Sequence, residues 1–128
     1  MEPLRTQGLD HVAITVSDLE RSHAFYADVL GLERAYEEWH VPVFMLAGKS
    51  GLALFPRESH PGSGEEAEVP DIRVTHVAFR VDRAQFDRAR AELPGEGIEP
   101  RFADHGSCHS IYFPDPDGHE IELTTYEV

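Results

Sequence analysis

Cysteine, basic residues and long apolar runs are all scarce in this chain of 128 residues. The single cysteine, Cys108, excludes a disulfide within the chain and any zinc site built from several thiolates of one chain. Only 11 Lys and Arg stand against 24 Asp and Glu, and the net charge of −13 argues against nucleic acid and anionic membranes as partners. No apolar run approaches the roughly 20 residues that span a bilayer, and residues 1–7 lack the basic and apolar blocks of a signal peptide. We therefore expect a cytoplasmic protein that binds neither nucleic acid nor membrane.

The chain repeats one small pattern of elements. Residues His11–Val16 alternate like a β-strand, and residues His76–Val81 repeat their His-Val-Ala-x-x-Val pattern. After each strand comes the spacing of a capping box, Ser17–Glu20 in the first copy and Asp82–Gln85 in the second, followed by apolar residues at helical spacing. Gly31 is placed to end the first helix with a positive φ. Because internal repeats define a fold better than local propensity does, we interpret the chain as two copies of one unit.

Three further strands are expected in each copy. In the first copy they lie around Ala35–Trp39, at Val43–Leu46 and at Leu52–Phe55. In the second copy the last two strands flank a Pro-Asp-Pro-Asp-Gly turn, and Ile121–Tyr126 forms the final strand. The pattern predicts an α+β fold in which two βαβββ modules form a cupped mixed β-sheet.

A polar segment separates the two modules. Residues 58–71 are rich in Pro, Gly, Ser and Glu and show no periodicity, which is typical of an exposed linker. We place module 1 at about residues 8–57, the linker at about 58–71 and module 2 at about 72–127. A chain of this length suits one domain, so residues 1–128 are expected to form a single domain.

Three residues of these strands form a candidate metal site. Glu122 lies on the strand face opposite Ile121 and Leu123, where a carboxylate is unfavourable unless a cation meets it. His11 and His76 occupy equivalent positions in the two modules, each with an alanine two residues further on. A lone histidine there is more often structural and a lone Glu more often solvent exposed, but the three together match a two-His-one-carboxylate triad. We therefore predict that His11, His76 and Glu122 bind one divalent ion.

Four segments carry a resemblance to a known family. They are Asp10–Ala13, Phe25–Leu32, Thr75–Phe79 and Asp115–Leu123, and together with the repeated modules they resemble the vicinal oxygen chelate superfamily. This superfamily holds glyoxalase I, bleomycin-resistance proteins, fosfomycin-resistance enzymes, methylmalonyl-CoA epimerase and extradiol ring-cleavage dioxygenases. The resemblance covers nearly the whole chain and implies the paired-module fold, whereas the reaction has to be argued from the site.

The number of protein ligands separates members of the superfamily. In glyoxalase I and the epimerase the last strand of the first module supplies a fourth ligand, and the resemblance makes Ala53 the counterpart of Glu122 here. No Asp, Glu, His or Gln lies between Ser50 and Arg57. The resemblance therefore implies three protein ligands, as in the dioxygenases and the fosfomycin-resistance enzymes.

A more local resemblance points to oxygen chemistry. The extradiol dioxygenase signature His-x5-aliphatic-Tyr-x2-Asp-Pro-x-Gly-x3-Glu is matched by His105, Ile111, Tyr112, Asp115, Pro116, Gly118 and Glu122. It implies an enzyme that cleaves a catechol-like or vicinal-diol small molecule with O₂, and it favours Fe(II) over Mn(II), Zn(II), Co(II) or Ni(II). In that chemistry His105 is the acid/base and Tyr112 donates a hydrogen bond to the substrate. The chain departs from this family in two ways. Two residues before His105 the signature allows Gly, Asn, Thr, Ile or Val, whereas this chain has Ala103. The chain also has two modules where many dioxygenases have four.

Other interpretations stay open from the sequence alone. His105 and Tyr112 are equally well explained as an exposed loop residue and a half-buried sheet aromatic. The fold also suits a lyase, isomerase or thiol transferase of the glyoxalase or fosfomycin type, or a non-catalytic binding protein like the bleomycin-resistance proteins. Several aromatic side chains either line an aromatic-accepting pocket or belong to the core: Tyr36, Trp39, Phe44, Phe55 and Phe102. We expect a homodimer, in which the modules pair within one chain or swap between two.

Overall fold

The chain divides into two compact units that follow the repeat. The computed structural model describes residues 9–57 and 74–128, together with residues 1–3, 5 and 7. Unit 1 is Met1–Val69 and unit 2 is Pro70–Val128, so their boundary falls in the predicted linker of residues 58–71, which lies outside the described residues. In the described part of the chain, no helix has the length and apolar character needed to cross a membrane.

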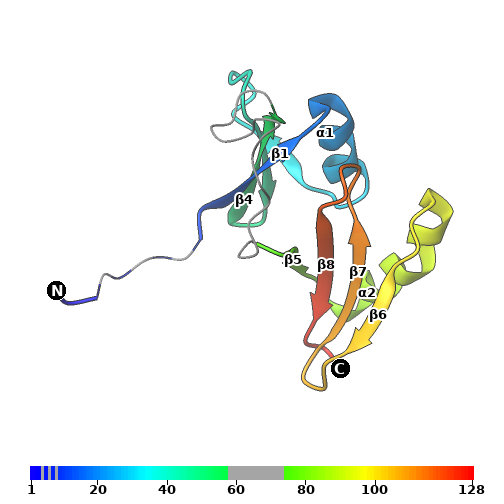
Figure 1. Ribbon diagram of the computed structural model, residues 1–128. Coiled ribbons are helices and arrows are strands. Elements are labelled where there is room, and N and C mark those ends of the chain that lie inside the picture. Colours follow the sequence, from blue (N-terminus) through cyan, green and yellow to red (C-terminus); the bar gives the residue numbers. More distant parts are fainter. Residues whose placement is uncertain (4, 6, 8, 58–73) are drawn as a thin grey trace. The chain divides into compact units, whose positions relative to one another are not determined.

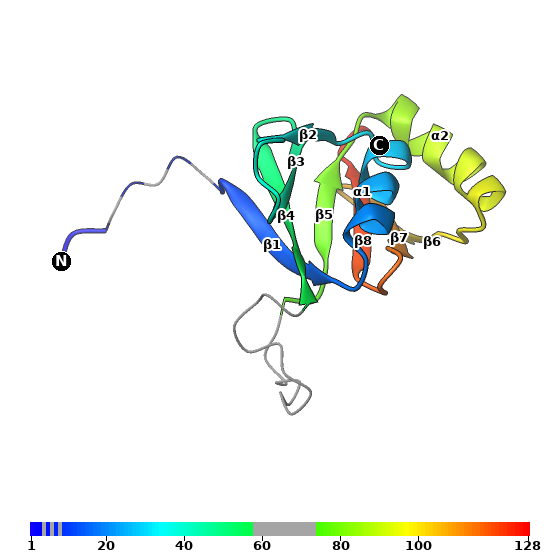
Figure 2. The ribbon, with the colours of Figure 1, turned by 90° about the horizontal axis from the view of Figure 1, so that it is seen from above.

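Unit 1 is a four-stranded mixed sheet with one helix. Its elements are β1 (His11–Val16), α1 (Leu19–Asp28), β2 (Glu33–Ala35), β3 (Val43–Ala47) and β4 (Ser50–Pro56). The strand order is β1-β4-β3-β2, with β1 parallel to β4 and the other pairs antiparallel (Figure 2). Helix α1 packs on β3 and β4, and the buried side chains of these elements include Tyr26, Met45, Leu52 and Leu54.

Unit 2 repeats this arrangement. Its elements are β5 (Val77–Arg80), α2 (Arg83–Glu92), the 3-10 helix η2 (Leu93–Glu96), β6 (Arg101–Asp104), β7 (His109–Pro114) and β8 (Glu120–Thr125). The order β5-β8-β7-β6, with β5 parallel to β8, matches that of unit 1, and Figure 1 shows β8, β7 and β6 side by side. The predicted α+β class and the two βαβββ modules are confirmed. That the two units form a single domain stays a prediction.

Both helices begin at an aspartate. Asp82 accepts a hydrogen bond from the Gln85 backbone N–H at 2.8 Å, at the predicted capping position. In unit 1 the predicted cap, Ser17, is wrong by one residue, because the Asp18 carboxylate accepts from the Arg21 backbone N–H at 3.0 Å. Serine and aspartate both cap helices well, so the sequence alone does not decide whether Ser17 or Asp18 is the cap.

Strand β2 ends earlier than predicted. We expected a strand around Ala35–Trp39, whereas β2 covers Glu33–Ala35. The reason is Tyr36, whose φ of 53° lies in the left-handed region and interrupts the extended backbone. The Tyr36 carbonyl then accepts a hydrogen bond from the Trp39 N–H at 2.8 Å, which closes a turn.

The turn between β7 and β8 is built around one buried carboxylate. Asp115 has a fully buried side chain and accepts hydrogen bonds from the backbone N–H groups of Asp117 at 2.9 Å and His119 at 2.8 Å. Its second oxygen lies 2.7 Å from Nδ1 of His119, and Gly118 takes a φ of 88°. The Asp-Pro-x-Gly part of the dioxygenase-like signature is therefore a structural turn that sets where β8 begins.

Gly51 allows close packing beside His11. The two residues are partners in the β1–β4 register, and a Cβ on Gly51 would lie 2.4 Å from two ring carbons of Phe44 and 3.3 Å from Cβ of His11. The Phe44 ring therefore lies across the space that any other side chain would fill. Its position, and that of the neighbouring His11, depends on glycine at this point.

Gly51→Ala is expected to destabilise the protein by about 1–3 kcal/mol, because the added methyl group forces the buried Phe44 ring out of its site. Urea denaturation measures this free energy of unfolding. Gly95→Ala is the matched control, since no atom lies within 4 Å of the position its Cβ would take, and it is expected to change stability by less than about 0.5 kcal/mol. Equal effects of the two substitutions would contradict the packing role of Gly51.

Candidate functional site

Glu122 is a buried carboxylate in the middle of a sheet. It faces away from the buried Ile121 and Leu123, as predicted, and is only 8% exposed. Its Oε1 lies 3.1 Å from Nε2 of His76, and its Oε2 accepts a hydrogen bond from Oγ of Ser110 at 2.7 Å. The structure therefore brings two of the three predicted ligands, His76 and Glu122, into direct contact.

The His76 ring is oriented by the residue before it. Nδ1 of His76 lies 2.9 Å from Oγ1 of Thr75, so Nε2 is the nitrogen turned toward Glu122. A polar partner on one imidazole nitrogen fixes the ring and its tautomer and leaves the other nitrogen as a metal donor. His76 has this arrangement.

His11 repeats the arrangement in unit 1. Its Nδ1 lies 2.7 Å from Oδ2 of Asp10, the residue that corresponds to Thr75, and its ring meets the Phe44 ring edge-on at 5.4 Å. The repeat therefore includes the polar residue that contacts Nδ1, Asp10 or Thr75, as well as the histidine itself. The carboxylate of Asp10 is the stronger of the two partners, because it accepts a charge-assisted hydrogen bond when the ring is cationic or metal-bound.

The parallel registers confirm which residue corresponds to Glu122. Ala78 on β5 pairs with Glu122 on β8, and Ala13 on β1 pairs with Ala53 on β4. Ala53 is thus the counterpart of Glu122, and this position in unit 1 offers no fourth ligand.

The donors of unit 2 fit a divalent ion. Two donors that each bind an ion at about 2.1 Å and at a right angle lie about 3.0 Å apart, close to the 3.1 Å between Nε2 of His76 and Oε1 of Glu122. In the described part of the chain, no Lys or Arg forms an ion pair with this buried carboxylate. Among the described residues no three His, Cys, Asp or Glu side chains gather at one point. The convergence of His11 with the His76–Glu122 pair stays a prediction.

The predicted catalytic pair is also in contact. The hydroxyl of Tyr112 lies 3.0 Å from Nε2 of His105, and Tyr112 is the β7 partner of Glu122 in the antiparallel register. The Tyr112 ring meets the His76 ring edge-on, with 6.0 Å between their centroids. His105 is exposed, so the pair connects solvent with the neighbourhood of Glu122.

The surroundings of Tyr112 keep it protonated. Burial raises the pKa of Tyr112 above its ordinary value of 10.0, and the negative charge of Glu122 raises it further. A hydrogen bond from Ser110 and the charge of Arg101 act in the opposite direction and do not cancel these effects. At neutral pH the Tyr112 side chain is therefore a neutral phenol that can donate a hydrogen bond.

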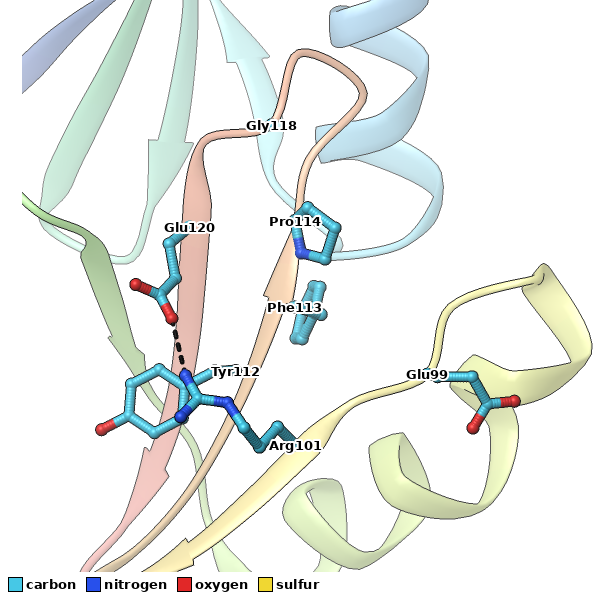
Figure 3. A pocket seen from close by; sticks show the side chains of 7 residues that line it. All are labelled: Glu99, Arg101, Tyr112, Phe113, Pro114, Gly118 and Glu120. Atoms are coloured by element: carbon cyan, nitrogen blue, oxygen red, sulfur yellow. Dashed lines mark hydrogen bonds and ion pairs between the residues drawn. The ribbon is translucent and has the colours of Figure 1, made fainter.

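Arg101 is a residue that the sequence analysis missed. Its guanidinium lies over the Tyr112 ring, 4.9 Å from the ring centroid, and its Nη2 is 3.0 Å from Oε1 of Glu120 (Figure 3). These side chains belong to a pocket of about 350 Å³ lined by Glu99, Arg101, Tyr112, Phe113, Pro114, Gly118 and Glu120. Arg101 comes beside Tyr112 because the two residues are paired in the β6–β7 register. Sequence spacing alone does not fix that register, so the sequence did not indicate Arg101.

Most of the candidate aromatic residues surround His11. Tyr36, Trp39, Phe44 and Phe55 line a pocket of about 410 Å³ in unit 1 together with His11. Phe102 does not belong to it. This ring meets Phe86 and His109 in unit 2 and lies under the guanidinium of Arg90.

Comparison with known proteins agrees with the architecture. The family model described as the glyoxalase/bleomycin resistance protein/dioxygenase superfamily matches residues 8–123. The metallothiol transferase FosB of Staphylococcus saprophyticus is 35% identical over 93% of this chain and 77% of its own length. The glutathione transferase FosA of Serratia marcescens is 29% identical over 91% of this chain and 79% of its own.

Solved structures show the same likeness. The fosfomycin resistance protein FosX from Mesorhizobium loti matches with a TM-score of 0.67 at 31% identity, over 94% of this chain and 93% of that chain. A lactoylglutathione lyase from Agrobacterium tumefaciens matches with a TM-score of 0.75, and at 24% identity over 94% of each chain it shows the fold alone. Sequence, module topology and family match agree over almost the whole chain, which therefore belongs to the glyoxalase/bleomycin resistance protein/dioxygenase superfamily.

Proposed function

We propose that this protein is a metal-dependent enzyme that opens a small electrophilic substrate by adding a thiol or water to it. The observation that carries the proposal is the contact between the buried Glu122 and the exposed His76, each of which is oriented by a further polar side chain. The choice of reaction is supported by the relatives FosB and FosA, which are named a metallothiol transferase and a glutathione transferase. Those relatives favour this reaction over the dioxygenase chemistry expected from the signature.

The metal would be held by His11, His76 and Glu122. When bound, a divalent ion of this kind polarises an epoxide or carbonyl oxygen as a Lewis acid. Addition and ring opening need no change in oxidation state, so the reason for favouring Fe(II) disappears and Mn(II), Zn(II), Co(II) and Ni(II) fit equally well. Ser110 holds one oxygen of Glu122, which leaves the other as the donor.

Tyr112 and His105 would handle the proton. As the sulfur of a thiol loses its proton to solvent and forms a C–S bond to an epoxide carbon, the C–O bond breaks and its electron pair stays on oxygen. The neutral phenol of Tyr112 gives that oxygen a proton, and the exposed His105, 3.0 Å away, returns a proton from solvent to Tyr112. With water in place of the thiol the same transfer yields a diol.

Extradiol cleavage is the second candidate. The contact between His105 and Tyr112 favours it, because both belong to the dioxygenase-like signature and they lie within hydrogen-bond distance. A non-catalytic binding protein is the third, and it has no need of an oriented histidine–carboxylate pair. The expected homodimer and cytoplasmic location stay predictions.

The metal-free protein is expected to take up about one Mn(II) or Zn(II) per chain, measured by elemental analysis, and to melt at a higher temperature when loaded. Glu122→Gln and His11→Ala should each weaken binding by about a hundredfold or more, and Asp10→Ala by about 10–100-fold through loss of the group behind His11. His40→Ala removes an exposed histidine and serves as the control. Uptake that survives in both ligand variants would exclude the triad.

Metal-loaded protein is expected to consume fosfomycin in the presence of L-cysteine or glutathione, or of water alone, with ³¹P NMR following the product. Tyr112→Phe should lower turnover by about 10²–10⁴-fold with unchanged metal content, because the proton donor is lost. Tyr126→Phe, at an exposed tyrosine, should leave turnover unchanged. Oxygen uptake with catechols by a protein that leaves fosfomycin intact would select the dioxygenase reaction instead.

In the metal-free protein Tyr112 should ionise at a higher pH than an ordinary tyrosine. Since the folded pKa is raised, the stabilisation from the neutral phenol is complete below the unfolded value of about 10 and is lost as the pH rises through the folded pKa. The difference in absorbance at 295 nm between wild type and Tyr112→Phe isolates this titration. Glu122→Gln should move the pKa back toward 10.0, and an unchanged titration would show that Glu122 has no part in the shift.

A further inference from the structure

The pocket beside His11 has walls that the proposed reaction leaves unexplained. It occupies about 410 Å³, and all its lining residues belong to unit 1: Asp10, His11, Tyr36, Trp39, Pro42, Phe44, Leu46, Lys49, Ala53 and Phe55. Seven of these ten residues are apolar or aromatic, and the other three, Asp10, His11 and Lys49, carry polar or charged groups. Pockets of this size and composition are typical binding sites for small molecules.

Two aromatic rings at the rim form an exposed stack. The rings of Tyr36 and Trp39 lie 4.4 Å apart and 18° from parallel, yet the two residues are 49% and 42% exposed. The Phe44 ring meets both of them edge-on, at 5.4 and 6.2 Å. Flat aromatic faces that stay in contact with water are well suited to bind another ring.

The backbone that carries this stack is in an unusual conformation. Tyr36 is the one non-glycine residue with a positive φ in the described part of the chain, and bulky residues rarely adopt this region. Such conformations persist where the surroundings maintain them and are concentrated at binding and catalytic sites. In this case the result is that the Tyr36 ring is held against Trp39 at the rim of the pocket.

The polar residues of the pocket indicate the other end of the ligand. Among the described residues no carboxylate forms an ion pair with Lys49. The Asp10 carboxylate of the same lining contacts Nδ1 of His11 through its Oδ2. An anionic oxygen group would meet an ammonium from Lys49 and a proposed metal ligand in His11 in one pocket.

We propose that the substrate is an aryl compound that carries a negatively charged oxygen group beside the epoxide or carbonyl oxygen at which it reacts, and that the pocket of unit 1 binds its ring. The ring contacts Tyr36, Trp39 and Phe44, and the charged group is held by Lys49. This inference rests on the proposed function, because it names the substrate class of the same site. A compact dianion without a ring would leave the aromatic walls in contact with water.

Trp39 is the only tryptophan of the chain, so its fluorescence reports this pocket without any need for activity. The probes are mandelate, hexahydromandelate and lactate, which share a carboxylate and a neighbouring hydroxyl and carry a phenyl, cyclohexyl or methyl group. In metal-free protein, mandelate should bind at least about tenfold more tightly than lactate, because more apolar area is buried. It should bind roughly three- to tenfold more tightly than hexahydromandelate, since only a flat ring stacks.

Variants separate the ring from the charge. Tyr36→Leu and Phe44→Leu should each abolish the preference for mandelate over hexahydromandelate, and Lys49→Gln should weaken all three acids alike. Phe102→Leu is the matched control, an exposed aromatic residue outside the pocket, and should keep the full preference. Far-UV circular dichroism checks that each variant is folded. If Phe44→Leu is unfolded, the ring preference of Tyr36→Leu alone tests the proposal.

Equal affinities for the three acids would overturn the proposal, as would a preference that survives Tyr36→Leu. The binding assay uses metal-free protein, so its failure is distinct from failure of the proposed function. Metal uptake and fosfomycin turnover with no ring preference would contradict the aryl substrate class and leave the proposed function supported. A ring preference in a protein that takes up no metal would support the aromatic binding pocket and contradict the proposed metal-dependent reaction.

Discussion

The candidate site depends on one unfavourable interaction, the burial of the Glu122 carboxylate in a central strand. Strand β8 lies between β5 and β7, and the Glu122 side chain contacts Ser110 and His76 and interacts with Tyr112. A buried carboxylate without a full positive charge beside it costs stability, and an apolar residue of similar size would usually be tolerated better. Unit 1 provides the comparison within the same chain, because Ala53 takes the equivalent register position in the same sheet order. The fold does not require a carboxylate at this position, so its presence in unit 2 points to chemistry.

The repeat also explains how the surrounding groups are placed. In each unit the residue before the histidine, Asp10 or Thr75, contacts Nδ1 of the imidazole. The Nε2 atom of each ring is therefore the nitrogen left for another partner. The turn around Asp115 sets the start of β8, and the antiparallel register then places Tyr112 beside Glu122. The orientation of the candidate site is thus produced by strand pairing and by a structural turn, and the polar residues that contact the proposed ligands complete it.

Much of this arrangement could be predicted from the sequence, for identifiable reasons. Strand alternation is a local property, so the faces of Glu122 and Ile121 were predictable, and the repeat predicted the order of elements in the two βαβββ modules. The failures have other causes. The end of β2 depends on a left-handed Tyr36 that no pattern announces, and the pairing of Arg101 with Tyr112 depends on a long-range register. The convergence of His11 with Glu122 is of this long-range kind as well, which is why it stays a prediction.

The dioxygenase-like signature illustrates how much chemistry a motif can carry. Of its matched residues, Asp115 and Gly118 build the turn, and Ile111 is fully buried. Apart from Pro116, which lies in the same turn, His105 and Tyr112 remain besides the proposed metal ligand Glu122, and a pair that transfers protons would serve ring opening by a thiol as well as oxygen chemistry. The motif therefore reports the fold of unit 2 more than its reaction. Selectivity then has to come from what the site admits, and the aromatic walls around His11 are the part of the described chain with the shape and composition to impose it.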